Sequence, residues 1–110
     1  MNFYKVDGKI IISDVPVGEP VTPNTTDGAY EKHVPVIEQN GDTVTVKVGT
    51  VEHPSMPEHY IEWILLETEM GFQIHYLKPG NKPEAAFKVN EKVVAAYEYC
   101  NLHGLWKAEA

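Results

Sequence analysis

Apolar and polar residues alternate over several short segments of the chain, the pattern of strands with one buried face. Residues 43–48, TVTVKV, place three valines on one face and threonine and lysine on the other. The apolar segment HVPVIE precedes them, and Asn40-Gly41 between the two segments favours a tight hairpin turn because both residues tolerate positive φ. Asp7-Gly8 gives the same signal between FYKV and KIIIS. We therefore expect two β-hairpins.

Three further apolar segments are candidates for strands. Residues 71–77, GFQIHYL, and 92–99, KVVAAYEY, are bounded by glycine, proline and asparagine. Residues 60–66, YIEWILL, follow the letters SMPE, which have the spacing of a capping box at a helix start. Because this apolar segment is short and rich in aromatic and branched residues, we predict one helical turn over 55–59 and then a strand.

The number and spacing of these segments favour an all-β fold. Roughly seven short strands separated by turns every 8–12 residues predict an antiparallel β-sandwich. The length of 110 residues is sufficient for one domain with one core. We expect a single domain over 1–110, with an N-terminal hairpin and arm over 1–28 and the sandwich over 29–110. Residues 13–30, rich in Pro, Gly, Thr and Asp, are predicted to be an ordered loop or arm.

Composition and charge narrow the classes of function. A formal net charge of −7 argues against general binding to nucleic acid or to an anionic membrane. No apolar run approaches the roughly 18 residues of a membrane helix, and the first residues, MNFYKVDGKI, contain no signal-peptide apolar region. We therefore expect a soluble cytoplasmic protein. A single cysteine excludes an intrachain disulfide scaffold.

The chain has five histidines, and four of them fall at predicted strand ends or in loops together with the cysteine. Only His75 lies inside a predicted strand, and we expect it to have a structural role. Loops at one end of a sandwich converge, so the remaining residues are candidates for one metal site. Imidazole suits iron, copper and zinc, and a thiolate adds a softer donor. The candidate ligands are His33, His53, His59, Cys100 and His103.

Two other metal sites fit part of this pattern. A blue-copper electron carrier is also a small β-sandwich with a late Cys followed by His, but its weak axial Met usually follows soon afterwards. Here Leu105, Trp106 and Lys107 follow the last histidine, and the last methionine is Met70. A non-catalytic zinc-binding β-sandwich module is the other alternative, although zinc prefers four ligands in a closed tetrahedron. Five candidates fit such a site poorly.

Three sequence segments taken together, EKHVPVIE, EHPSMPEHYIEWI and YEYCNLHGLW, resemble the superoxide reductase family, which includes neelaredoxin and desulfoferrodoxin. The resemblance extends from about residue 29 to residue 107. It implies an immunoglobulin-like β-sandwich with one non-haem iron per chain, four imidazoles in the base of a square pyramid and a thiolate at its apex. The matching ligands are His33, His53, His59 and His103 for the base and Cys100 for the apex. Desulfoferrodoxin also has a four-cysteine iron centre, which a chain with one cysteine cannot form, so the one-iron type is implied.

The resemblance also implies an activity and its partners. The reaction is the reduction of superoxide by one electron to hydrogen peroxide, with the iron re-reduced by a rubredoxin-like electron donor. Lys32 would supply a mobile positive charge beside the open coordination position, and Glu31 would supply the carboxylate that occupies this position when iron is ferric. Related proteins assemble as dimers or tetramers, so we expect a homo-oligomer with the 13–30 arm as a candidate contact.

Overall fold

The computed structural model describes residues 1–27 and 32–110, and within these residues the protein is built from strands without any helix. Within the same residues, no helix is long and apolar enough to span a bilayer. The strands are β1 (Phe3–Val6), β2 (Lys9–Ile12), β3 (Glu19–Val21), β4 (Pro35–Asn40), β5 (Thr43–Val48), β6 (Ile61–Thr68), β7 (Gly71–Tyr76), β8 (Glu84–Lys88), β9 (Val93–Cys100) and β10 (Gly104–Glu109).

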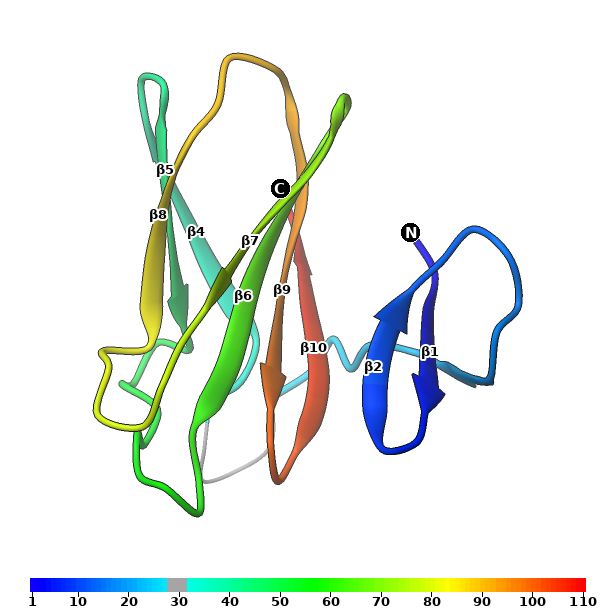
Figure 1. The fold of residues 1–110 in the computed structure, drawn as a ribbon. Helices are drawn as coiled ribbons and strands as arrows, with labels where there is room; N and C mark the ends of the chain where they lie inside the picture. Colours follow the sequence, from blue (N-terminus) through cyan, green and yellow to red (C-terminus); the bar gives the residue numbers. More distant parts are fainter. Residues whose placement is uncertain (28–31) are drawn as a thin grey trace.

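These strands form three antiparallel sheets that lie as successive layers (Figure 1). The middle sheet has the order β10-β9-β6-β7, and the sheet β4-β5-β8 covers one of its faces. The N-terminal sheet β2-β1-β3 covers the other face. The middle sheet and the sheet β4-β5-β8 form the sandwich, which confirms the predicted antiparallel all-β fold. Two of its seven strands, β8 and β10, were not among the predicted segments, and the predicted strands β1 and β2 lie in the N-terminal sheet instead.

The central strands of the middle sheet, β6 and β9, are buried on both faces, and this explains the nearly continuous apolar sequence of β6. Ile64 and Leu66 join the core shared with β5 and β8, whereas Trp63 and Leu65 pack in a second core with Phe3 of the N-terminal sheet. A strand covered on both sides gains from apolar residues at successive positions, so it loses the alternation of a half-exposed strand. The N-terminal sheet, which is the third layer, therefore explains why the segment YIEWILL is almost continuously apolar.

Both predicted hairpins are present. Asp7 and Gly8 occupy the β1–β2 turn with φ of 49° and 76°, as a primed turn requires. In the second hairpin Asn40 is instead paired with Thr43, so the two turn residues are Gly41 and Asp42.

Two other expectations need correction. Part of the predicted 13–30 arm is the strand β3, which pairs with β1. No helical turn forms over residues 55–59: Met56 and His59 exchange backbone hydrogen bonds of 2.9 Å in both directions and enclose a tight turn. One helical turn fixes many dihedral angles for few hydrogen bonds, so a capping signature without a long helix behind it does not stabilise one.

Candidate metal centre

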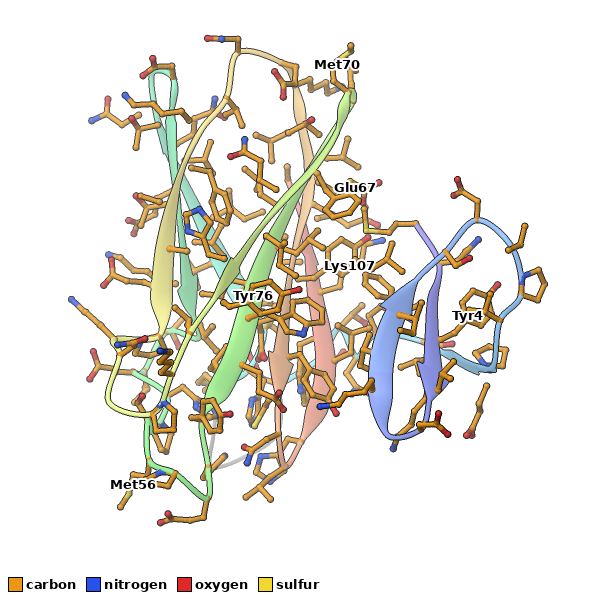
Figure 2. All side chains as sticks on the ribbon, viewed as in Figure 1. Tyr4, Met56, Glu67, Met70, Tyr76 and Lys107 are labelled. Carbon is orange, nitrogen blue, oxygen red and sulfur yellow. The ribbon has the colours of Figure 1, made fainter. Side chains whose placement is uncertain are left out.

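The candidate ligands meet at the end of the sandwich where β9 ends and β6 begins, the lower end in Figure 1. Three connections supply them: the segment before β4, the loop between β5 and β6, and the turn between β9 and β10. Figure 2 marks the middle connection by Met56, which lies opposite Met70 at the other end of the molecule.

The four histidine rings of this end follow one another around a closed four-sided arrangement with sides of similar length, called the imidazole square below. The ring centroids of His33 and His53, and of His53 and His59, are 4.7 Å apart. The remaining two sides, from His59 to His103 and from His103 to His33, measure 5.0 and 4.9 Å. Histidines that lie far apart in the sequence are therefore neighbours in space, as we expected if the loops converge at one end of the sandwich.

The sulfur of Cys100 lies close to two opposite corners of this square, His53 and His103. Its Sγ is 3.6 Å from Nε2 of His53 and 3.9 Å from Nδ1 of His103, and the side chain is fully buried. The donor atoms of these residues and of His33 all lie within 4.8 Å of one another. Two ligands on opposite sides of one metal, each bonded at about 2.0–2.3 Å, would be separated by about 4.0–4.6 Å. The cluster therefore has the dimensions of a single metal site.

The orientation of His53 is determined by its own loop. Its Nδ1 is 2.7 Å from the carbonyl oxygen of Pro54, which accepts a hydrogen bond from Nδ1–H. The opposite nitrogen, Nε2, then has a lone pair directed toward Cys100. A hydrogen bond from the non-ligating nitrogen to a carbonyl is the usual way in which proteins orient a metal-binding histidine.

His33 is held by residues from distant parts of the chain. Oδ1 of Asp27 accepts hydrogen bonds from the backbone N–H groups of His33 and Val34. Oε2 of the fully buried Glu98 lies 3.5 Å from Nδ1 of His33. Burial raises the pKa of Glu98 to about 7, and the neighbouring His33 opposes this rise. Glu98 and Cys100 share one face of β9, because side chains alternate along a strand.

Asn101 connects the loop that contains His59 to the turn that contains His103. Its side-chain Oδ1 accepts from the N–H of Tyr60 at 3.0 Å, and its Nδ2 donates to the carbonyl of Glu58 at 3.1 Å. Its backbone N–H donates to the carbonyl of Tyr60 at 3.2 Å. One residue within the sequence CNLH therefore holds the two loops together.

Lys32 is half-buried and precedes His33 directly. Gly49 packs against the backbone of Lys32 so closely that a Cβ atom on Gly49 would lie 2.2 Å from the Lys32 carbonyl oxygen. Gly49 also has a φ of 77°, which only glycine adopts without strain. The predicted carboxylate, Glu31, lies outside the described residues and stays a prediction.

His75 lies elsewhere, as the sequence predicted. It is exposed on β7, and its ring lies 4.4 Å from that of the buried Phe87. It does not belong to the square of rings.

Sequence reasoning missed the residues that orient the ligands. The position of Glu98 two residues before Cys100 on a strand is a signal that could have placed both on one face. The other missed residues contact segments that lie far from them in the sequence, so only the folded chain shows their roles. The missed residues are Asp27, Gly49, Glu98, Asn101 and Trp106.

This small β-sandwich gathers four imidazoles and one cysteine thiol at one end, and it therefore has the donors of a mixed nitrogen and sulfur metal site. The family model described as desulfoferrodoxin matches residues 25–109, and the chain belongs to this family.

Named relatives and solved structures agree with this assignment. The chain is 51% identical over 96 residues to a desulfoferrodoxin of Nitratidesulfovibrio vulgaris, covering 84% of this chain and 76% of the relative. It is 38% identical over 99 residues to a superoxide reductase of Pyrococcus abyssi, covering 72% of this chain and 85% of the relative. The crystal structure of the superoxide reductase from Treponema pallidum superposes with a TM-score of 0.86 at 36% identity, covering 98% of this chain and 97% of that one. The one-iron superoxide reductase from Giardia intestinalis gives a TM-score of 0.63 at 36% identity, covering 73% and 97%.

Proposed function

We propose that this protein reduces superoxide to hydrogen peroxide at a mononuclear non-haem iron held by His33, His53, His59, His103 and Cys100. The observation that carries the proposal is the closed square of four imidazole rings with the Cys100 sulfur against it. Relatives and structural neighbours named superoxide reductase support the reaction.

The donor set suits iron better than the alternatives. Imidazole is a common ligand of iron, and thiolate is the softer partner that donates electron density. A closed tetrahedral zinc site would leave one of these five donors unused. Bound iron would supply the electron for superoxide by alternating between its ferrous and ferric states.

The residues of the site divide into a buried and an open side. His33, His53 and Cys100 are buried, whereas His59 is half-buried and His103 is exposed. Cys100 would bind a metal as the thiolate, so binding of a divalent ion would release the thiol proton, and the thiolate would neutralise part of the charge of the ion inside the protein. A small anion would approach from the side of His59 and His103, where solvent reaches the rings.

Lys32 is proposed to attract superoxide, because the net charge of −7 repels an anion and a local positive charge must offset it. We expect Lys32→Ala to slow superoxide capture about tenfold at low salt, to flatten its dependence on ionic strength and to leave the iron content unchanged. Pulse radiolysis over a range of salt concentrations measures this rate. Lys88→Ala is the matched control, because it removes the same charge from an exposed lysine paired with Asp42. Equal rates for Lys32→Ala and the parent at low salt would remove Lys32 from the mechanism.

A small redox protein such as a rubredoxin is proposed as the electron donor. Two large apolar side chains flank the loops of the site: Met56 is 53% exposed and Leu102 is 60% exposed. Exposed apolar groups beside a redox site support the small, short-lived contact that electron transfer needs.

The function is tested by the metal content and the visible spectrum of the purified protein. We expect iron equimolar with the chain and a thiolate-to-iron absorption band that disappears on mild reduction and returns on addition of superoxide. Copper with an intense blue band would instead support the electron carrier. Zinc, or no metal after anaerobic reconstitution with ferrous iron, would contradict the proposal.

A further inference from the structure

We propose that Trp106 is a positioning residue that holds His33 and His103 at adjacent corners of the imidazole square. The inference rests on the proposed function only in taking the square as a metal site. Trp106 is half-buried at the start of β10 and contacts both histidines through different parts of its indole.

The face of the indole supports His33. The two rings are stacked, with centroids 4.8 Å apart and planes inclined by 16°. Glu98 lies near Nδ1 of the same imidazole, at 3.5 Å. Stacking restrains the plane of the His33 ring, and the carboxylate beside Nδ1 favours the rotation that turns Nε2 toward the cluster.

The edge of the indole holds His103. Nε1–H of Trp106 donates to the carbonyl oxygen of His103 at 3.1 Å. This carbonyl lies just before Gly104, whose φ of 85° begins the return of the chain into β10. The hydrogen bond therefore helps to hold the backbone of the turn that contains His103, together with the pairing of Gly104 with Cys100.

Trp106 is itself fixed by strand pairing on both sides. Across the β9–β10 ladder it is paired with Glu98, and directly opposite residues in antiparallel strands project from the same face. On the other side Asn24 donates from its N–H to the carbonyl of Leu105 and accepts from the N–H of Lys107, both at 2.9 Å. The cross-strand pair of Glu98 and Trp106 therefore contacts the His33 ring at its face and at Nδ1, and we call this pair the seat of His33.

A metal site gains affinity when its ligands need no ordering on binding. Because one side chain contacts both residues, Trp106 contributes to the 4.9 Å spacing between the His33 and His103 rings. Removal of the indole leaves the His33 ring without its stacking partner and the turn at His103 without one hydrogen bond. The folded sandwich would persist, but two corners of the square would need to be ordered by the metal.

The test is titration of metal-free protein with Co²⁺ alone, followed by calorimetry and by the visible d–d spectrum of the bound ion. We expect Trp106→Ala to bind Co²⁺ about 10–100-fold more weakly, with an altered d–d spectrum. Trp106→Phe keeps an aromatic face but loses the N–H, so a loss of about twofold to tenfold is expected, as for one hydrogen bond. Trp63→Phe is the matched control, because Trp63 stacks on Tyr99 in the second core. This control should keep the affinity and spectrum of the parent.

A second measurement does not depend on the metal. In metal-free protein the stack predicts that NMR signals of the His33 ring protons are shifted upfield by the indole ring current. This shift should disappear in Trp106→Ala and persist in Trp63→Phe. Parent-like Co²⁺ affinity in Trp106→Ala, or an unshifted His33 ring in the parent, would overturn the inference. A protein that binds Co²⁺ as expected but does not react with superoxide would contradict the proposed function alone.

Discussion

Replacing Cys100 with serine is expected to abolish both the thiolate-to-iron absorption band and superoxide reduction. The serine hydroxyl stays protonated near neutral pH and has no sulfur orbital from which charge transfer to the metal could occur. Loss of a residue that only orients a ligand costs about 10–100-fold in affinity or activity, so removal of a proposed direct ligand is expected to cost more than about 100-fold. The rate of superoxide consumption and the visible spectrum of reconstituted protein measure the effect.

Two controls distinguish the loss of the sulfur ligand from a loss of folding. Serine is close to cysteine in size, and Cys100 is fully buried at the end of β9, so circular dichroism should show an unchanged sandwich. His75→Gln is the control, because it removes an imidazole that lies on β7 beside Phe87. The control should keep the band and the activity. A band of parental intensity in Cys100→Ser would mean that the sulfur is not a ligand.

Gly49→Ala is expected to lower both the stability of the protein and its affinity for metal. A Cβ atom at Gly49 would lie 2.2 Å from the Lys32 carbonyl oxygen and 2.7 Å from the Lys32 Cβ. The backbone of Lys32 must therefore move, and His33 is the next residue. An alanine held at a φ of 77° also raises the free energy of the folded state by about 1–2 kcal/mol, because its Cβ atom crowds the backbone in this conformation.

Gly8→Ala provides a matched control for this variant. Gly8 has nearly the same φ, 76°, but a Cβ atom there would meet nothing within 4 Å. Both substitutions should lower the free energy of unfolding by the backbone strain, and Gly49→Ala should lower it further. Only Gly49→Ala should weaken Co²⁺ binding, by about tenfold or more because His33 is displaced. Equal Co²⁺ affinity in the two variants would show that the contact with Lys32 does not position His33.

The strands were predictable because their signal is local. Alternation in TVTVKV follows from the two-residue period of a strand, and the glycines at 8 and 41 identify turns that need positive φ. The helical turn at 55–59 was wrong for a related reason. A capping signature is equally local, and without a helix to follow it does not stabilise a helical turn; the residues that follow form the strand β6, as predicted.

For the candidate site, the sequence predicted the metal ligands but not the residues that orient them. The histidines and the cysteine were identified by their type and by their positions at strand ends, and the segments YEYCNLHGLW and EHPSMPEHYIEWI identified the family. The residues around them were not identified. Asp27 accepts a hydrogen bond from the backbone of His33, and Asn101 accepts one from the loop that contains His59. No pattern in the sequence indicates these contacts.

The sequence alone thus determined the all-β class, five of the seven strands of the sandwich and the set of donors proposed to bind iron, because each depends on residue type and short-range spacing. Only the tertiary structure decided that the N-terminal sheet covers the second face of β6 and β9, and that Glu98 and Trp106 form the seat of His33. The physical reason is that burial and ligand orientation arise from contacts between segments far apart in the chain. The pairing of strands that are distant in sequence, such as β6 with β9, brings such segments together, and no local pattern specifies it.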